Sequence, residues 1–355
     1  MAHSLSSMPS YPRRRGAAML AAWLSAAAGP VSGQTAPPVG RVTCTRRLMG
    51  VAWQVTLHGP PAEAAAAAAA ALDEVARLER ILSDYDPESE LSRLSAAAPT
   101  GRPVPLSPPL AEVLSRAVAI RDASDGAFDP TVGPLTALWR QARRSGRLPS
   151  AERLAAARAA VGPATLVVQG ATAMLLRPGM RLDLGGIGMG YAIDRALERI
   201  AALGIEAALI DASGDVGASA PPPEADGWSV AVAPLDPRGP AGAGETIRLA
   251  HAAVTTSGDA FQAVEIGGRR YSHIVDPRTG IGVAGPAAVT VIAPDCTTAD
   301  AVATAASVLG PDAGRAFVAR LPGCAAAFRW EERGSLRRAT TAGWPALALR
   351  SGAPR

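Results

Sequence analysis

Two oxygen-bearing side chains in the last third of the chain, Asp300 and Thr304, could hold a hard metal cation. They stand four residues apart within residues 298–309, whose apolar spacing predicts a helix, so both lie on one helical face. Mg²⁺ prefers oxygen ligands and is commonly held by one or two carboxylates together with substrate phosphates. A helix cap and a buried hydroxyl can also produce this spacing, so the pair alone leaves a structural role open.

A glycine-rich turn over residues 185–190 is a candidate phosphate cradle. It follows residues 180–184, which we expect to form a strand, and leads into a helix over residues 193–203 that Gly204 closes. The N–H groups at a helix N-terminus favour anions. Tyr191 occupies the third glycine position of the dinucleotide-binding fingerprint, so the sequence favours a phosphate site and argues against a Rossmann domain.

His273 is a candidate catalytic base. It lies in residues 271–280, which we expect to be a strand running into a proline-containing turn. An imidazole can act as a base, donate to a phosphate or donate to a backbone carbonyl. Asp276 and Arg278 flank Pro277, and this pattern is also typical of a turn held by an aspartate cap and an ion pair.

Aromatic side chains make up only 4% of the chain, so a flat ligand ring would find few stacking partners. Tyr85 lies in residues 82–94, which could otherwise be only a polar turn and a helix cap. Phe128 lies in the turn-rich residues 125–134. Residues 254–259 add hydroxyls and a glycine after an expected strand.

The elements that would position these residues alternate irregularly between helix and strand. Further helices are expected over residues 61–81, 109–124 and 151–161, and strands over residues 53–57, 164–168, 207–211, 230–232 and 288–292. This order favours an α+β fold over a doubly wound parallel sheet.

Composition excludes several chemistries. The chain has no lysine, so all 35 basic residues are arginine, and a Walker A loop or a Schiff-base lysine is excluded. The net charge is +4, but Arg13, Arg14 and Arg15 supply three of these charges, and residues 1–35 contain no acidic residue. The remainder therefore carries a charge of +1, which gives little electrostatic reason to bind nucleic acid.

Residues 1–35 resemble an export signal and linker. Three arginines precede the apolar residues 16–24, a run too short to span a bilayer, although a tethered helix remains an alternative. No second long apolar segment follows, so we expect a soluble exported protein in the bacterial periplasm or at the outer face of the inner membrane. No cysteine ends the apolar run, so a lipid anchor is not expected. Residues 36–355 are expected to form one domain. The three cysteines allow at most one disulfide and lack a metal-binding spacing.

Eight segments, in order along the chain, resemble the ApbE-type flavin transferases, enzymes that move FMN from FAD onto a protein threonine. They are Met49-Gly50, Tyr85-Asp86-Pro87 with Ser89-Glu90, and residues 126–133, 182–187, 213–215, 256–259, 271–280 and 299–300. The resemblance implies a two-lobed α+β fold with mixed or antiparallel sheets, flanking helices and the flavin between the lobes.

The resemblance also assigns site residues. The positions that would contact FAD are Met49, Tyr85, Ala127, Phe128, Asp129, Asp183, Met189 and Ile274. Tyr85 would lie against the isoalloxazine ring. The Gly186 carbonyl, Asp300 and Thr304 would hold Mg²⁺. The family commonly has alanine and lysine where this chain has Gly188 and Met189, so one positive charge near the cofactor is missing.

The implied reaction is phosphoryl transfer, in which positioning and charge neutralisation dominate. Mg²⁺ would bridge the FAD pyrophosphate through Asp300, and His273 would take the proton of the acceptor hydroxyl, with Asp276 as an orienting partner. The acceptor would carry a motif like Asp-x-x-Ser-Gly-Ala-Thr, typically on a membrane-bound electron-transfer subunit. The alternatives are a Mg²⁺-dependent FAD pyrophosphatase, which Tyr85 disfavours, and an exported flavin-binding protein without catalysis.

Overall fold

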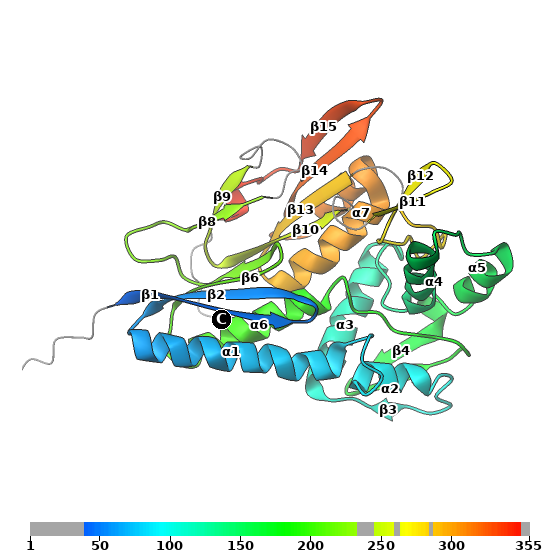
Figure 1. Cartoon of the computed structure of the whole chain (residues 1–355), viewed down its shortest axis with the longest axis horizontal. Helices are drawn as coiled ribbons and strands as arrows, with labels where there is room; N and C mark the ends of the chain where they lie inside the picture. Colours follow the sequence, from blue (N-terminus) through cyan, green and yellow to red (C-terminus); the bar gives the residue numbers. More distant parts are fainter. Residues whose placement is uncertain (1–38, 233–244, 259–262, 284–286, 349–355) are drawn as a thin grey trace, which may run out of the picture. The chain divides into compact units, whose positions relative to one another are not determined.

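An eight-stranded sheet, antiparallel throughout, organises the fold (Figure 1). The computed structural model describes residues 39–232, 245–258, 263–283 and 287–348. In spatial order the strands are β1 (Gly40–Leu48), β2 (Val51–Gly59), β6 (Ala207–Ala212), β7 (Asp215–Ala218), β10 (Ala252–Gly258), β13 (Ala287–Ala293), β14 (Ala325–Glu332) and β15 (Ser335–Thr340). Within it, β10 and β13 pair with Thr256 opposite Thr290.

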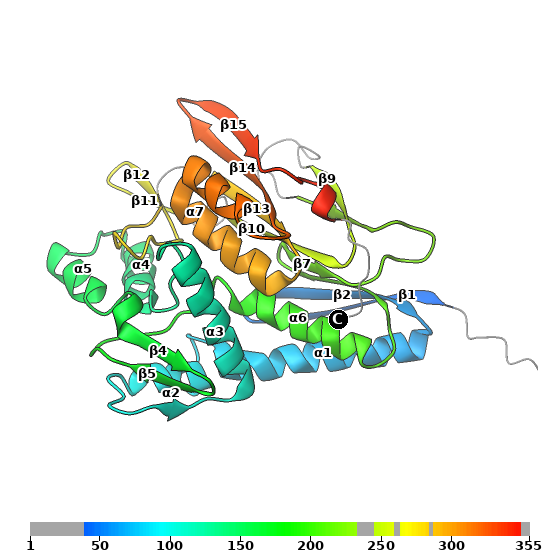
Figure 2. The ribbon, with the colours of Figure 1, turned by 180° about the vertical axis from the view of Figure 1, so that it is seen from behind.

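Three helices pack on one face of this sheet (Figure 2). They are α1 (Pro61–Leu82), α6 (Gly188–Ala201) and α7 (Cys296–Ala319). The buried face of α1 is rich in alanine, and small side chains allow close approach between helices and sheet. Helix α7 is kinked at Gly310, whose φ of 77° is followed by Pro311.

A smaller layer covers the opposite face of the sheet. It consists of β8 (Trp228–Ala231), β9 (Thr246–Leu249) and the short 3₁₀ helix η2 (Ala346–Ala348). Trp228 and Leu249 are buried there against Val254 of β10 and Ile292 of β13. The central sheet therefore has an apolar core on each side.

A second group of elements adjoins the helical side. It comprises α2 (Glu90–Ala96), α3 (Pro108–Ala123), α4 (Gly133–Ser145), α5 (Ala151–Arg158), η1 (Pro163–Thr165), the sheet of β3 (Val104–Pro105), β5 (Thr172–Leu175) and β4 (Leu166–Gln169), and the hairpin of β11 (Ala263–Ile266) and β12 (Arg269–Ser272). Trp139 of α4 contacts both β12 and the turn after it, because its ring lies 5.0 Å from that of Tyr271 and its Nε1 donates to the Gly280 carbonyl at 2.8 Å.

The predicted α+β class and the expected helices are confirmed, and one expected strand is wrong. Residues 180–184 are extended but belong to no sheet. The Leu182 N–H donates to Ser95 Oγ at 3.0 Å, and the Asp183 N–H donates to the Pro130 carbonyl at 2.8 Å. Loops, rather than a neighbouring strand, supply the hydrogen-bond partners of this segment's backbone. An alternating pattern of apolar residues looks the same in both cases, so the sequence could not show which partner the backbone has.

Three further predictions from the sequence concern the export signal, the membrane and a disulfide. The predicted export signal and the boundary at residues 35 and 36 lie outside the described residues. Among the described residues, no helix is both long enough and apolar enough to cross a membrane. Cys44, Cys296 and Cys324 are all free thiols, so the one disulfide that the sequence allowed is not formed.

Candidate active site

The turn before α6 and the middle of α7 meet where the sequence predicts a cation. A Cβ atom placed on Gly186 would lie 2.7 Å from Thr304 Oγ1, so the backbone of the turn touches the threonine hydroxyl. Asp300 lies one turn earlier on α7, and its Oδ2 accepts a hydrogen bond from the Gly190 N–H at 3.2 Å. The structure thus brings the three predicted cation ligands to one place.

Much of this cluster consists of oxygen atoms that do not belong to carboxylates. Ser257 Oγ, near the end of β10, lies 3.3 Å from Thr304 Oγ1. Within the described part of the chain, no three or more His, Cys, Asp or Glu side chains form a group that could hold a metal ion. A cation here would therefore need hydroxyl and backbone oxygens and also oxygens of the substrate, which is the usual mode for Mg²⁺.

The carboxyl groups near this cluster are poorly solvated. The pKa of Asp300 is raised to about 7, chiefly by burial, while the Gly190 N–H opposes the shift and the nearby Asp194 charge adds to it. Burial, Asp300 and Asp211 together raise the pKa of Asp215, at the start of β7, well above its ordinary value. Neither Asp300 nor Asp215 forms an ion pair with an arginine that the structure describes. A divalent cation would stabilise both ionised carboxylates.

The predicted phosphate cradle at the N-terminus of α6 is partly filled by the protein itself. The Gly190 N–H, in the first turn of α6, is bonded to Asp300 Oδ2. A carboxylate satisfies such an N–H as well as a phosphate does, because both carry negative charge toward the positive end of the helix dipole. The turn therefore serves first to hold Asp300.

Asp194 of α6 caps the N-terminus of α7 from outside that helix. Its Oδ1 accepts from the Cys296 N–H at 2.8 Å, and its Oδ2 accepts from the Thr297 N–H at 2.9 Å and from Thr297 Oγ1 at 2.5 Å. Burial, followed by the charge of Asp295, raises the pKa of Asp194 to about 6. This contact sets the position of α7, and with it Asp300, relative to α6.

Replacing Asp194 by Ala is expected to lower the free energy of unfolding by about 3 kcal/mol, because two backbone N–H groups lose their acceptor in a buried place. Urea denaturation measures this change. Asp73→Ala is the control, since the exposed Asp73 only pairs with Arg46 at the surface and its loss should cost less than about 1 kcal/mol. A loss below about 1 kcal/mol in Asp194→Ala would contradict the capping role.

Asp183 links the predicted flavin-binding residues to the cation cluster. Its Oδ1 accepts from the Gly185 N–H at 2.8 Å, which fixes the turn beside Gly186. Its Oδ2 accepts from Thr136 Oγ1 at 2.7 Å and from Arg140 Nη2 at 3.0 Å. Tyr85 lies on the other side of this arginine, whose guanidinium carbon is 4.2 Å from the centroid of the tyrosine ring.

The three predicted flavin contacts in residues 127–129 are buried and locally bonded. Phe128 packs into the main core. The Asp129 carboxylate accepts from the Thr131 N–H at 2.8 Å and from Thr131 Oγ1 at 2.6 Å. Burial raises the pKa of Asp129, and the bonds to Thr131 oppose that shift. Asp129 therefore shapes its own turn, and a ligand would meet Ala127 and its neighbours mainly through the backbone.

The other predicted residues occupy loops and helix ends. Met49 lies in the β1–β2 turn, where its N–H donates to Glu79 Oε1 at 2.9 Å. Met189 is partly buried in the first turn of α6. His273 and Ile274 follow β12 directly and are both half-buried.

Asp276 is bonded within its own turn, as the structural alternative for this segment predicts. Its carboxylate accepts from the Arg278 N–H and Nε, both at 2.9 Å, and from Arg278 Nη2 at 3.0 Å. Because the two charges lie two residues apart across Pro277, they close the turn on themselves. The role of Asp276 as an orienting partner of His273 stays a prediction.

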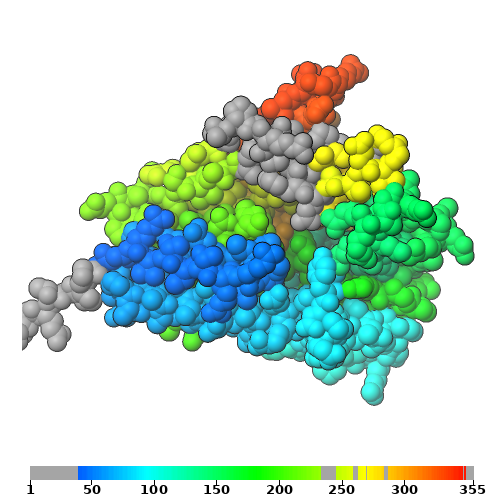
Figure 3. All heavy atoms as spheres, viewed as in Figure 1, coloured from blue at the N-terminus to red at the C-terminus, as the bar shows by residue number. Residues whose placement is uncertain are grey.

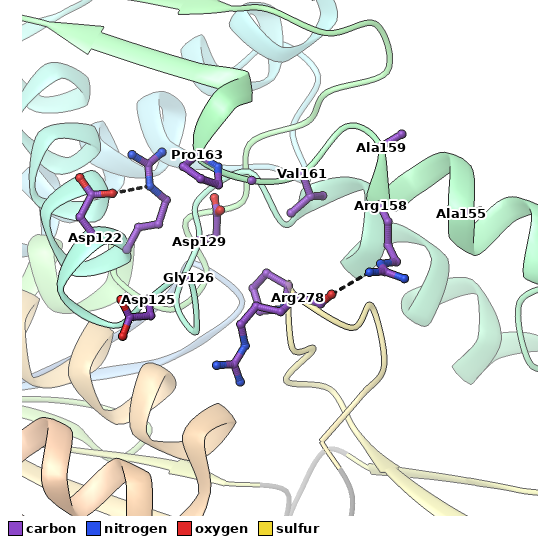
Figure 4. A pocket seen from close by; sticks show the side chains of 13 residues that line it. Asp122, Asp125, Gly126, Asp129, Ala155, Arg158, Ala159, Val161, Pro163 and Arg278 are labelled. Carbon is purple, nitrogen blue, oxygen red and sulfur yellow. Dashed lines mark hydrogen bonds and ion pairs between the residues drawn. The ribbon is translucent and has the colours of Figure 1, made fainter.

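Figure 3 shows a hollow in one face of the molecule, bordered by the blue β1–β2 hairpin, the green helix α4 and the yellow β11–β12 hairpin. A separate cavity of about 700 Å³ lies between the end of α3, α5 and the turn at Pro277 and Arg278. Asp125 and Asp129 line one side of it and Arg158 and Arg278 another (Figure 4). It contains none of the predicted cation ligands, so this cavity and the cation cluster are different places.

Three residues that the sequence did not single out matter here: Asp84, Arg140 and Asp194. Asp215 falls in residues 213–215, which carried the resemblance but received no role. Asp84 stands beside Tyr85 in a segment that was noticed only for its aromatic ring. Asp194 is a buried charged residue on a helix face that is otherwise largely apolar, and this is the signal that could have found it. Arg140 shares its face of α4 with Arg143 and Arg144, so no such signal marks it.

Comparison with known proteins finds relatives along most of the chain. The ApbE family model matches residues 49–328. The FAD:protein FMN transferase of Haemophilus influenzae is 30% identical over 238 residues, covering 65% of this chain and 69% of that protein. The FAD:protein FMN transferase of Escherichia coli K12 is 30% identical over 283 residues, covering 77% of this chain and 80% of that protein.

Solved structures give the same result for the fold. The crystal structure of the Pseudomonas stutzeri flavinyl transferase ApbE in its apo form matches with a TM-score of 0.76 and 31% identity, covering 88% of this chain and 98% of that chain. The predicted ApbE-like α+β fold is thereby confirmed. Because the family model spans well over half of the sequence, this chain belongs to the ApbE family.

Proposed function

We propose that this chain transfers FMN from FAD to a threonine or serine hydroxyl of an acceptor protein, forming a phosphoester and releasing AMP. Membership of the ApbE family and the names of the curated relatives support the activity. The single structural observation that carries it is the meeting of Gly186, Asp300 and Thr304 beside a turn that Asp183 holds.

The residues present fit Mg²⁺, because the cluster offers a buried carboxylate, a hydroxyl and a backbone carbonyl, all hard oxygen donors. Asp300, Thr304 and the Gly186 carbonyl would hold the ion. Mg²⁺, when bound, supplies positive charge to the FAD pyrophosphate and to the developing charge on AMP. Tyr85 would stack on the isoalloxazine ring, and the backbone of residues 127–129 would line the FAD site.

His273 would take the proton of the acceptor hydroxyl, since a threonine hydroxyl is a weak nucleophile until a base removes its proton. His273→Ala is therefore expected to lower the rate of FMN transfer at pH 7 by about 100-fold or more. The assay is FMN transfer to a peptide acceptor. Full transfer by the variant would show that His273 is not the base.

The activity itself is tested with the full chain stripped of flavin and metal, then mixed with FAD, Mg²⁺ and an acceptor domain carrying the motif Asp-x-x-Ser-Gly-Ala-Thr. Flavin fluorescence that survives denaturation on the acceptor, with an equal amount of AMP, is the expected result. AMP and free FMN without labelled acceptor would mean that water is the acceptor. FAD bound without AMP release would mean a binding protein.

We also propose that the chain works outside the cytoplasm and modifies a membrane-bound electron-transfer subunit. The arginine-rich and apolar residues 13–24 support export, and an acceptor exposed on the same side follows from that location. N-terminal sequencing of the protein from a periplasmic fraction tests this. Retention of Met1 in a cytoplasmic fraction would overturn it.

A further inference from the structure

Arg140 of α4 lies at the centre of a buried charge network that the transfer mechanism above does not use. Its Nη1 donates to Asp84 Oδ2, and its Nη2 donates to Asp183 Oδ2 at 3.0 Å. The two carboxylates come from segments about 100 residues apart in sequence, one before α2 and one before α6. One guanidinium group therefore joins three separate parts of the chain.

The burial of these groups makes the network rigid. The side chains of Asp84 and Asp183 are each only 7% exposed, and that of Arg140 is 18% exposed. A planar guanidinium can satisfy two carboxylates at once in a fixed geometry, which a lysine ammonium does less well. Burial and the neighbouring Asp183 raise the pKa of Asp84, so its ionised form depends on Arg140.

The same guanidinium covers one side of the Tyr85 ring, with its central carbon 4.2 Å from the ring centroid. Tyr85 itself is 74% exposed, so the remaining face of its ring is open to solvent. The backbone around it is also fixed, because the N–H groups of Tyr85 and Asp86 donate to Ser83 Oγ at 3.2 and 3.1 Å. An exposed aromatic ring held in this way is prepared to stack on a flat ligand.

Arg140 also connects this ring to the turn that carries the cation cluster. Asp183, its second partner, holds the Gly185 N–H at 2.8 Å, next to Gly186. A single network therefore fixes the separation between the place for a flat ring and the place for a pyrophosphate. FAD carries both groups on one molecule, so this separation matters for its binding.

We propose that Arg140 is a positioning residue that holds Tyr85 as the stacking platform for the isoalloxazine ring of FAD. The inference rests on the proposed function, and it adds a residue that acts through Tyr85 rather than on the reacting atoms. It requires that the effect of Arg140 on FAD binding disappear when the Tyr85 ring is removed.

The test is a double-mutant cycle on FAD binding by the full chain, in EDTA so that no cleavage follows. Arg140→Gln and Tyr85→Ala are each expected to weaken FAD binding by about tenfold, as measured by equilibrium dialysis. The double variant is expected to bind no more than about twofold more weakly than Tyr85→Ala alone. The change in the flavin absorption spectrum on binding should be lost in all three variants.

Three further variants serve as controls. The double variant with Asp84→Asn and Arg140→Gln removes one buried carboxylate together with the guanidinium charge. It is expected to bind FAD as weakly as Arg140→Gln alone. Arg144→Gln removes an exposed arginine from the same helix and is expected to leave FAD binding unchanged. Arg140→Lys keeps the charge without the planar fork and should restore only part of the affinity.

Wild-type affinity and spectrum in Arg140→Gln would overturn the proposal, and so would losses in the single variants that multiply in the double variant. Either result leaves the proposed function intact if the wild-type chain still transfers FMN in Mg²⁺. Failure of the wild-type chain to bind FAD both in EDTA and in Mg²⁺ would overturn both proposals.

Discussion

Asp300→Asn is expected to abolish Mg²⁺-dependent release of AMP from FAD, with a fall in rate of about 1000-fold or more. Asparagine keeps the shape of the side chain and can still accept from the Gly190 N–H through its amide oxygen. It removes the only negative charge among the three proposed cation ligands. AMP release at saturating FAD, measured over a range of Mg²⁺ concentrations, checks this expectation.

The same variant is expected to be more stable than the wild type when metal is absent and the pH is high. The pKa of Asp300 is raised to about 7 in the folded chain, mainly by burial, against an ordinary value near 3.8. Between these two pH values the folded chain holds more protons than the unfolded chain, so the free energy of unfolding falls as the pH rises. In Asp300→Asn no carboxyl group titrates at this position, so this fall in the free energy of unfolding is absent.

Urea denaturation in EDTA at pH 4 and pH 8 separates these effects. The variant should exceed the wild type by about 1–3 kcal/mol at pH 8 and match it near pH 4. Added Mg²⁺ should stabilise only the wild type. Asp312→Asn, which changes an exposed carboxylate of the same helix, is the control and should show neither effect. Equal Mg²⁺ stabilisation of Asp300→Asn would exclude Asp300 as a ligand.

Gly190→Ala is expected to separate α6 from α7 and to cost about 3 kcal/mol or more of stability. A Cβ atom on Gly190 would lie 2.3 Å from the Cys296 carbonyl oxygen and 3.0 Å from Asp300 Cβ. The carbonyl belongs to the first turn of α7, which Asp194 holds in place, so it cannot move away without losing those hydrogen bonds. Urea denaturation measures the loss of stability.

Gly188→Ala supplies the matched control two residues earlier in the same helix. Its Cβ would meet only Leu184 Cβ, at 3.6 Å, which is an ordinary contact. We expect unchanged stability or a gain of up to about 1 kcal/mol, because alanine favours the helix more than glycine does. Similar losses in both variants would mean that helix propensity, rather than the contact with α7, decides the outcome at Gly190.

Local patterns in the sequence were enough to predict most elements and the identity of the cation cluster. The periodic apolar residues of α1 and the four-residue step from Asp300 to Thr304 are properties of one helix each, so they can be recognised without knowing what packs against it. The glycine turn before α6 was recognised for the same reason. These features determined the α+β class and the Asp300 and Thr304 pair, and the resemblance to the ApbE-type flavin transferases added Gly186 to that pair as an expectation.

Residues 180–184 show where such reasoning fails, and Asp276 shows where it leaves two partners open. An apolar alternation predicts an extended segment, but whether it pairs with a strand depends on what lies beside it, and here loops and side chains take its hydrogen bonds. Asp276 has two neighbours of different chemistry within three residues, His273 and Arg278. The turn geometry brings Arg278 to its carboxylate.

The sequence by itself determined the helices, the glycine turn and the residue types able to hold a cation and a flat ring. Only the tertiary structure decided that Asp194 caps α7, that Gly190 lets the two helices touch, and that Arg140 joins Tyr85 to Asp183. The chain has 35 arginines, and nothing in their spacing says which one meets two buried carboxylates. Packing brings these distant segments together, and burial then requires each charge to be paired.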